Sequence, residues 1–234
     1  MIARSAAGLL ALVLPAVAHA QAYQCKVPST LTVPETRIDG PTRQMPITGY
    51  TLAMSWSPEF CKPREDSRAD RIQCSGDNGR FGLVVHGLWP DGAHSWPQYC
   101  PVARKITPAE ARKNLCMMPS TQLMSRQWAK HGSCMSKRPE TYFKVTRILW
   151  NSLRKPDYDL LSRKEGLTAG DIRHAFADAN GRHVQPAHVG VKLNERGWLQ
   201  EIRLCYGKDF MPTRCKTQTW GAKDDAPAKI WRGL

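Results

Sequence analysis

Two short segments of the chain each place a histidine beside a glycine, and their side chains could act together on a phosphodiester. The first segment, residues 85–90, reads Val-His-Gly-Leu-Trp-Pro, and the second, residues 128–134, reads Trp-Ala-Lys-His-Gly-Ser-Cys. One imidazole can take a proton while the other gives one, and a lysine ammonium can stabilise charge on a phosphoryl group. His86, Lys130 and His131 therefore supply what metal-free cleavage of RNA requires.

The two segments resemble the two active-site segments of the ribonuclease T2 family of secreted endoribonucleases. The family pattern His-Gly-Leu-Trp-Pro is complete in the first segment, from His86 to Pro90. The second family pattern reads Glu-x-x-Lys-His-Gly-Thr-Cys, and here Ser133 stands for the threonine while Gln127 stands where the glutamate is expected. The resemblance runs from about residue 50 to residue 215, and it implies a secreted enzyme that cleaves RNA.

The resemblance also implies a role for each residue of the two motifs. We expect His131 to act as the base that takes the proton of the ribose 2′-OH, and His86 as the acid that protonates the departing 5′-oxygen, each transfer being worth ~10²–10⁴-fold. Lys130 would compensate charge on the crowded phosphorane. The substrate would be single-stranded RNA and the first product a 2′,3′-cyclic phosphate. The route uses no metal and no cofactor, and DNA, which lacks the 2′-OH, would not be cut.

Three further residues are expected to contact the RNA. The indole of Trp89 can stack on a base, and Asp91 can accept a hydrogen bond from that base. Arg126 occupies a position where some family members carry a third histidine, and we expect it to contact a phosphate. These three residues would bind substrate and take no part in proton transfer.

Gln127 divides the hypotheses about activity. An amide keeps a donor and an acceptor, but it cannot exchange a proton as a carboxylate does, so we expect a reduced rate or an altered pH dependence. The alternative is an exported RNA-binding protein of the same fold with weakened or lost catalysis. A third hypothesis is a disulfide-stapled secreted protein whose basic surface, with a formal net charge of +14, meets another polyanion.

The elements around the motifs predict how these side chains meet. A helix over residues 125–131 would place Gln127 one turn before Lys130 and His131, with all three on one face, and Gly132 would end it. A short apolar strand over residues 81–85 would end at Gly87, so that the neighbouring histidine reaches the same cleft and the tryptophan follows in a turn. Either motif alone fits an ordinary packed histidine or a basic helix end, whereas both in one chain favour an active site.

The remaining pattern indicates an α+β fold with a central antiparallel sheet, packed helices and disulfides. Strands are expected within residues 50–61, 81–85, 189–193 and 198–204, the last two as a hairpin. Helices are expected at residues 107–115, 125–131, 139–153 and 168–179, the last with Thr168 as its N-cap. Strands and helices do not alternate regularly, which disfavours a doubly wound fold.

The cysteine count is eight, which in an exported chain predicts four disulfides. By resemblance to the family, Cys205 pairs with Cys215 and Cys134 pairs with Cys100. The partners of the other four cysteines remain open. Zinc binding is the rival interpretation, but the sequence contains no Cys-x-x-Cys pair, which disfavours it.

The N-terminal residues predict export. Residues 1–20 are typical of a signal peptide, with Arg4, an apolar run and an Ala-His-Ala cleavage site. Residues 21–47 are polar and proline-spotted and predict an extended arm, and residues 48–234 are expected to form a single catalytic domain. The apolar run is too short to span a bilayer, so we expect a periplasmic or extracellular monomer without a membrane anchor.

Overall fold

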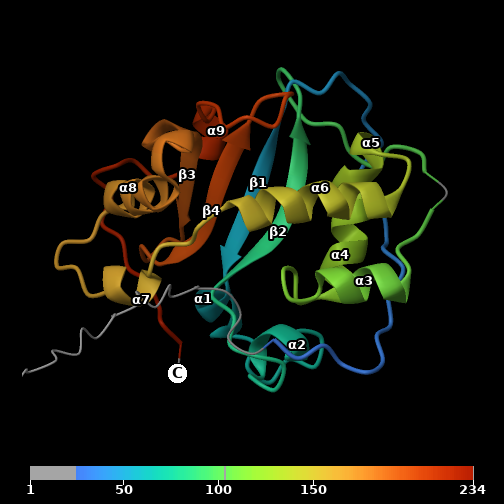
Figure 1. Ribbon diagram of the computed structural model, residues 1–234, viewed down its shortest axis with the longest axis horizontal. Helices are drawn as coiled ribbons and strands as arrows, with labels where there is room; N and C mark the ends of the chain where they lie inside the picture. Colours follow the sequence, from blue (N-terminus) through green and yellow to red (C-terminus); the bar gives the residue numbers. More distant parts are fainter. Residues whose placement is uncertain (1–24, 103, 234) are drawn as a thin grey trace, which may run out of the picture.

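The described residues, 25–102 and 104–233, form a four-stranded antiparallel sheet with the strand order β2-β1-β4-β3 in a computed structural model of the chain (Figure 1). The predicted signal peptide, residues 1–20, lies outside the described residues. The expected α+β fold with a central antiparallel sheet is confirmed. The strands are β1 Gly49–Trp56, β2 Leu83–Asp91, β3 Val189–Leu193 and β4 Leu199–Tyr206.

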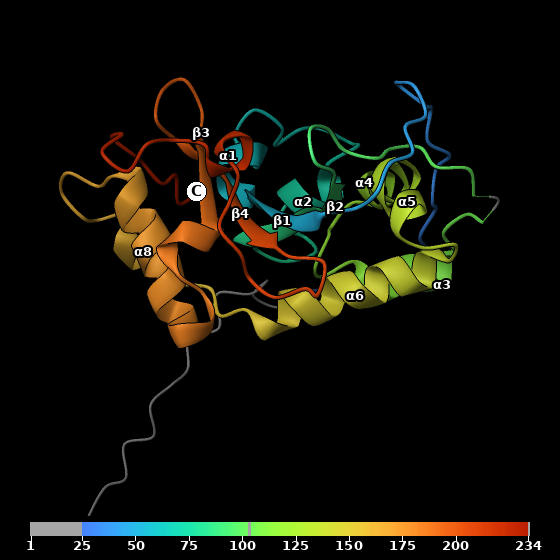
Figure 2. The ribbon, with the colours of Figure 1, turned by 90° about the horizontal axis from the view of Figure 1, so that it is seen from above.

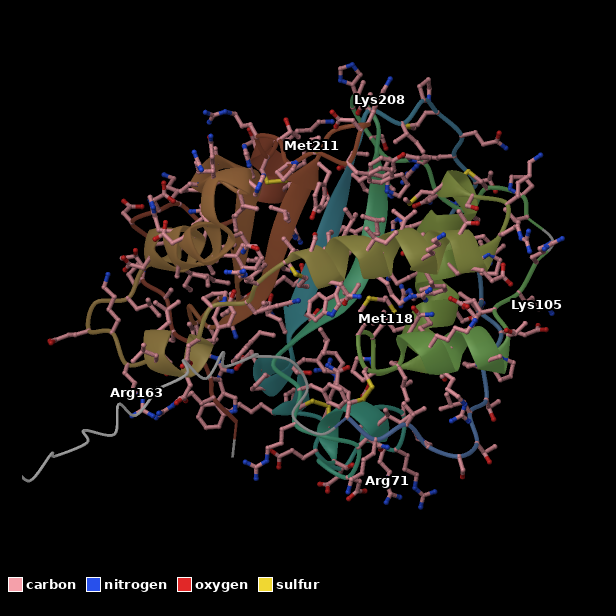
Figure 3. All side chains as sticks on the ribbon, in the orientation of Figure 1. Arg71, Lys105, Met118, Arg163, Lys208 and Met211 are labelled. Carbon is pink, nitrogen blue, oxygen red and sulfur yellow. A yellow bond between two sulfur atoms is a disulfide. The ribbon has the colours of Figure 1, made fainter. Side chains whose placement is uncertain are left out.

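Helices α6 and α8 cover one face of the sheet, as the view from above shows (Figure 2). Side chains alternate between the two faces of a strand, so Leu52 and Met54 of β1 join the fully buried core beneath these helices. Met118 also lies inside, whereas Lys105 and Arg163 point outward at the rim (Figure 3). The opposite face of the sheet is free to carry polar side chains.

Helices and helical turns fill the connections between strands. The α-helices are α1 Ser57–Cys61, α2 Arg71–Cys74, α3 Pro108–Asn114, α4 Thr121–Gln127, α5 Ser133–Met135, α6 Pro139–Ser152, α7 Tyr158–Leu161, α8 Ala169–Asn180 and α9 Thr217–Trp220. The π-helix is η1 Trp128–Gly132, and the 3₁₀ turns are η2 Gly181–His183 and η3 Pro186–His188. Thr168 caps α8 as expected, in a reciprocal capping box with Asp171.

Three sequence expectations about elements were wrong. The first core strand ends at Trp56, because Pro58 starts helix α1 where the strand was expected to continue. Strand β2 runs on to Asp91 instead of ending at Gly87, because its pairing with β1 extends to Gly49. The helix expected at residue 125 begins at Thr121, since the Ser120 side chain accepts from the Leu123 N–H and caps it there.

The eight cysteines all lie in the described residues and form four disulfides, as expected. The two pairs implied by resemblance, Cys100–Cys134 and Cys205–Cys215, are confirmed. The two pairs left open are Cys25–Cys116 and Cys61–Cys74. Because every thiol is used in a disulfide, none is free to bind zinc.

The segment before β1 runs as extended chain along the edge of the molecule beside α3 and α4 (Figure 1). Cys25 fastens its start to Cys116, and the Arg112 guanidinium donates to the backbone carbonyls of Pro28 and Ser29. Near its end, Arg43 pairs through both backbone groups with Gln98. Within the described residues, no helix is long and apolar enough to cross a membrane.

Candidate active site

A β-bulge in strand β2 sets the direction of His86. Ala53 of β1 pairs with Gly87 and the next residue, Met54, pairs with Val85, so His86 is the extra residue between them. Regular alternation would put it on the same face as Leu88, which is buried in the core. The bulge instead directs the imidazole to the polar face of the sheet, the kind of redirection for which bulges are used near active sites.

Glu201 of β4 binds His86 on that face. The Nδ1 atom of His86 lies 2.7 Å from Oε1 of Glu201, whose side chain is only 8% exposed. The other carboxylate oxygen accepts from the Arg203 guanidinium at 2.9 Å and 3.1 Å. Burial alone would raise the pKa of Glu201, but the hydrogen bond from His86 and the charge of Arg203 outweigh it and hold the pKa at about 2. A fixed negative charge therefore stands behind the imidazole.

The second motif lies on one continuous helical segment formed by α4, η1 and α5. The π-helical turn at Trp128–Gly132 carries both Lys130 and His131, and the helix resumes at Ser133 instead of ending at Gly132 as expected. A π-helical turn inserts an extra residue into the helix and is frequent at functional sites. The side chains of Lys130 and His131 therefore lie at a local irregularity of the helix. His86 likewise lies at a local irregularity of the sheet, the β-bulge.

Glycines in both motifs permit close contacts that a Cβ would block. A Cβ at Gly132 would come within 2.6 Å of the Trp128 ring and 2.7 Å of the Tyr142 ring. A Cβ at Gly87 would lie 2.1 Å from Oε1 of Gln127. Because real Cβ atoms do not approach so closely, the absence of a side chain at Gly87 leaves room for the Gln127 amide beside the Trp89 indole.

Trp89 joins the two motifs. Its ring centroid lies 5.2 Å from that of His86, edge to face, and 5.7 Å from that of His131. Its indole N–H donates to Oε1 of Gln127 across 2.7 Å, and the Gln127 side chain is buried. Trp89 lies within strand β2, so the expected turn position was wrong. The structure brings His86, His131 and Gln127 together around its ring, whereas the Lys130 ammonium contacts Asp39.

His131 is held as a neutral imidazole. Burial lowers its pKa to about 3, and the charges of Lys130, His86 and Arg126 act in the same direction. Its ring is 8% exposed, and among the described residues no polar group is a hydrogen-bond partner of Nδ1. A buried, unprotonated ring nitrogen beside a cation can accept a proton.

The ammonium of Lys130 faces the N-terminal segment. Its Nζ lies 3.4 Å from Oδ1 of Asp39, and the Arg126 guanidinium donates to Oδ2 of the same carboxylate at 2.5 Å. The Tyr99 hydroxyl donates a short hydrogen bond to Oδ1. The Asp39 carboxylate, which belongs to the segment before β1, is thus contacted by three donors from later in the chain: Tyr99, Arg126 and Lys130.

Asp91 lies two residues beyond Trp89 at the end of the same strand. Its Oδ2 accepts a hydrogen bond from the Thr51 hydroxyl at 2.8 Å. Burial raises the pKa of the Asp91 carboxyl, against the opposing effects of Thr51 and the charge of Lys216. The structure therefore places it on the same strand as the indole, with one oxygen already engaged.

A groove of about 730 Å³ begins at His86 and continues across the polar face of the sheet. Its walls include Arg126 and Ser120 at the α4 side and Lys192 and Arg196 at the β3–β4 hairpin. Basic side chains in a groove suit a polyanionic strand, and the same lining also carries the carboxylates of Glu59, Asp70 and Glu201. Within the described residues, no group of three or more His, Cys, Asp or Glu side chains could hold a metal ion.

Sequence reasoning missed Glu201, Arg203 and Asp39. A partial signal exists for the first two, because they are polar residues that alternate with the apolar Ile202 along a predicted strand and so share its polar face. Asp39 stands in no motif, and its contacts with the site depend on the folded path of the chain.

The chain has a disulfide-bonded α+β fold in which the rings of both motif histidines lie against one indole. The model of the ribonuclease T2 family matches residues 48–215, and the chain belongs to that family. The matched region includes both motifs and ends at Cys215, so it contains every motif residue while the N-terminal segment that carries Asp39 lies outside it.

Several curated relatives carry ribonuclease names. A ribonuclease of Aeromonas hydrophila is 39% identical over 166 residues, covering 68% of this chain and 72% of that one. A probable ribonuclease of Haemophilus influenzae is 29% identical over 191 residues, which is 76% of this chain but only 65% of that relative's length. Ribonuclease I of Escherichia coli is 26% identical over 204 residues, covering 68% of this chain and 75% of that one.

Solved structures of plant proteins share the fold. An RNase-related protein from Calystegia sepium aligns with a TM-score of 0.61 at 20% identity, over 77% of this chain and 96% of that one. The self-incompatibility-associated SF11-RNase of Nicotiana alata aligns with a TM-score of 0.60 at 21% identity, over 80% of this chain and all of that one. At these identities the likeness concerns the fold.

Proposed function

We propose that this protein is a metal-independent endoribonuclease that cleaves single-stranded RNA by transesterification, through a 2′,3′-cyclic phosphate to 3′-phosphate ends. One observation carries the proposal: two imidazoles from distant motifs pack against one indole, at centroid distances of 5.2 Å and 5.7 Å. One ring is backed by a carboxylate and the other is buried and neutral. These are opposite environments, as an acid and a base acting in one reaction require.

His131 acts as the general base. It is unprotonated at neutral pH, so it can accept the proton of the ribose 2′-OH as that oxygen attacks the adjacent phosphorus. An RNA phosphate in the site offsets the positive charge of Lys130, which helps to hold the pKa of His131 low.

His86 acts as the general acid. We assign its Nδ1 proton to the hydrogen bond with Glu201, because a carboxylate can only accept. The Nε2 proton then faces the substrate and passes to the 5′-oxygen as the P–O bond breaks. The imidazole side chain is 33% exposed, so it reaches the groove while its other nitrogen stays fixed.

The surrounding residues bind and place the RNA. Lys130 and Arg126 supply positive charge for phosphate oxygens, and Trp89 offers an aromatic surface for a base. Asp91 accepts a hydrogen bond from that base through its remaining oxygen. Gln127 holds the indole in position and takes no proton. DNA is not cut, because the attacking nucleophile is the substrate's own 2′-OH.

The protein acts outside the cytoplasm, in the periplasm or the extracellular medium, as a monomer. Four disulfides support this location, because such bonds persist in oxidising compartments. The predicted signal peptide at residues 1–20 supports it independently.

The direct test is incubation of the purified oxidised protein with RNA and excess EDTA, followed by mass analysis of the fragment ends. We expect ends with 2′,3′-cyclic phosphate from the wild type and about 10²- to 10⁴-fold slower cleavage by His86→Ala and His131→Ala. His174→Ala, an exposed position on α8, is the matched control and should keep full activity. Cleavage that stops with EDTA, or that survives both site variants, would overturn the mechanism.

Substrates with different leaving groups test the two histidine roles separately. A uridine 3′-phosphodiester with a 4-nitrophenol leaving group needs little protonation as the P–O bond breaks, whereas one with an alcohol leaving group needs it fully. His86→Ala should therefore lose much less activity on the nitrophenyl ester than on a dinucleotide. His131→Ala should lose activity on both, and the opposite pattern would exchange the two roles.

A second function is favoured by one observation. Gln127, which stands where the family has an acid, is buried and already bonded to Trp89, so the site lacks that carboxylate. A protein that binds RNA without cleaving it is the consequence if this group is essential. Intact RNA over a wide pH range, together with undiminished RNA binding, would establish that function instead.

A further inference from the structure

The carboxylate of Asp39 lies among the cationic groups of the site. Oδ2 accepts from the Arg126 guanidinium at 2.5 Å, and Oδ1 lies 3.4 Å from Nζ of Lys130 and accepts from the Tyr99 hydroxyl. The hydrogen bond from Tyr99, followed by Lys130 and Arg126, holds the pKa of Asp39 below its ordinary range despite some loss of hydration. An anion therefore occupies this place in the free protein.

The donors around Asp39 are those that bind phosphate oxygens. A guanidinium, an ammonium and a phenolic hydroxyl can each donate a hydrogen bond to a phosphate oxygen, as they do here to the carboxylate oxygens. They converge beside His131, whose pKa is affected by Lys130, Arg126 and Asp39. An RNA strand whose scissile phosphate lies between the two histidines would bring phosphate oxygens to this set of donors.

The backbone that carries two of the donors, Tyr99 and Lys130, is fixed without help from Asp39. The Tyr99 N–H donates to the backbone carbonyl of Lys130, and Tyr99 has a left-handed backbone with φ of 51°. The adjacent disulfide Cys100–Cys134 ties this segment to the helix that carries Lys130. The two residues therefore stay side by side when their side chains exchange the carboxylate for another anion.

The segment that carries Asp39 is fixed on both sides of it. Upstream, the Thr36 hydroxyl donates to that of Ser125 at 2.8 Å, and downstream the backbone of Arg43 pairs with that of Gln98. Between these anchors, the Asp39 side chain is 40% exposed. Its ion pairs are of the exposed kind that contributes little free energy each, so a competing anion can replace them.

We propose that Asp39 occupies the place of an RNA phosphate, and that RNA must displace it to bind. The N-terminal segment is then an internal competitor that lowers the affinity of the site for phosphates and leaves the chemical step unchanged. This inference rests on the proposed function only in taking RNA as the ligand of Lys130 and Arg126.

The test measures binding of a single-stranded 2′-O-methyl RNA, which has no free 2′-OH and cannot be cleaved. Asp39→Asn keeps the shape of the side chain and removes its charge, so it should bind about 3- to 10-fold more tightly than the wild type. Its dependence on salt should steepen by about 0.7 in log Kd against log salt concentration, for one more phosphate contact. Glu35→Gln is the matched control, because its carboxylate lies in the same segment but pairs with Lys105.

A second variant locates the effect. Adding Arg126→Ala to Asp39→Asn should abolish the gain in affinity if the freed guanidinium receives the phosphate. Unchanged or weaker binding by Asp39→Asn, with unchanged thermal unfolding, would overturn the proposal. So would a fall in kcat at unchanged KM, which would make Asp39 a carboxylate that the reaction needs.

Failure of the proposed internal competitor can be distinguished from failure of the proposed enzymatic function. Tighter binding by Asp39→Asn without any cleavage of ordinary RNA by the wild type would retain the internal competitor and reject the enzyme. Normal cleavage by both proteins with equal binding of the 2′-O-methyl RNA would retain the enzyme and reject the competitor.

Discussion

The indole N–H of Trp89 donates a hydrogen bond to the side-chain oxygen of Gln127, and this bond joins strand β2 to helix α4 at the centre of the site. Gly87 makes the approach possible. An amide performs this positioning role as well as a carboxylate would, because both offer an oxygen acceptor. What the amide cannot do is exchange a proton or carry a negative charge beside His131.

Gln127→Glu should therefore raise kcat. A carboxylate at this position keeps the bond to Trp89 and adds a negative charge that favours the protonated form of His131, so proton transfer from the 2′-OH becomes easier. Steady-state cleavage of a dinucleotide over a range of pH measures the effect. Gln127→Leu is the control: it removes the acceptor, leaves the indole N–H unpaired at a buried position, and should lower both activity and stability, the latter by about 1–3 kcal/mol. Equal kcat values for wild type and Gln127→Glu would mean that this position does not limit the rate.

Glu201→Gln should reduce cleavage about 10- to 10²-fold. The buried carboxylate, which a pKa of about 2 keeps negatively charged, accepts the hydrogen bond from Nδ1 of His86 and so fixes the imidazole with its other nitrogen toward the substrate. The variant removes that charge and replaces the carboxylate acceptor by a neutral amide, so donation of a proton to the departing oxygen becomes slower. The defect should shrink on a nitrophenyl ester, because that leaving group needs little protonation.

The control for that experiment is Glu195→Gln, which removes the same charge at an exposed position in the β3–β4 turn. Its rates on the dinucleotide and on the nitrophenyl ester should match those of the wild type. A Glu201→Gln protein with the same defect on both substrates would show that Glu201 only supports the fold.

The central residues of the candidate site could be predicted from the sequence because they stand in two contiguous motifs. His86, Trp89, Lys130 and His131 needed no knowledge of the fold, and the pattern of apolar residues was enough to place β3 and β4 within a few residues. The bulge at His86 escaped prediction because it is a property of pairing: it exists only where Gly87 and Val85 meet successive residues of β1.

The residues that surround the motifs could not be found in the same way. Glu201 is 115 residues from His86, and Asp39 is 91 residues from Lys130. The contact of Glu201 with His86 depends on strand order, and the contact of Asp39 with Lys130 depends on the path of a segment without regular structure. No local sequence pattern indicates which residue either of them contacts. The π-helical turn at Trp128–Gly132 was also missed, and no pattern in the sequence marks it.

Removing the Cys25–Cys116 disulfide should cost more stability than removing Cys61–Cys74. The first closes a loop with a sequence separation of 91 and the second one of 13, so loss of loop-closure entropy predicts about 4–5 and about 3 kcal/mol respectively. Paired Cys→Ser variants, compared by equilibrium urea unfolding, measure both values. The reverse order of the two losses would mean that loop length does not control their contributions.

The neutral, buried state of His131 should make the fold sensitive to mild acid. Its pKa is about 3 in the folded chain and about 6.5 when unfolded, so between these values the unfolded state binds more protons and stability falls as pH falls. From about pH 7 to about pH 5, this single group should remove about 2 kcal/mol from the free energy of unfolding. Glu201 adds little in this window, because its unfolded carboxyl titrates only near pH ~4.3.

Urea unfolding at the two pH values measures this contribution. The change in the free energy of unfolding between the two pH values is compared for wild type and His131→Phe. The variant lacks the titrating group, so its free energy of unfolding should fall by about 2 kcal/mol less than that of the wild type over the same interval. His174→Gln, exposed on α8, should keep the wild-type dependence. Identical pH dependence in wild type and His131→Phe would mean that the folded chain protonates His131 as readily as the unfolded chain does. The general base would then be charged, and unable to accept a proton, at mildly acidic pH.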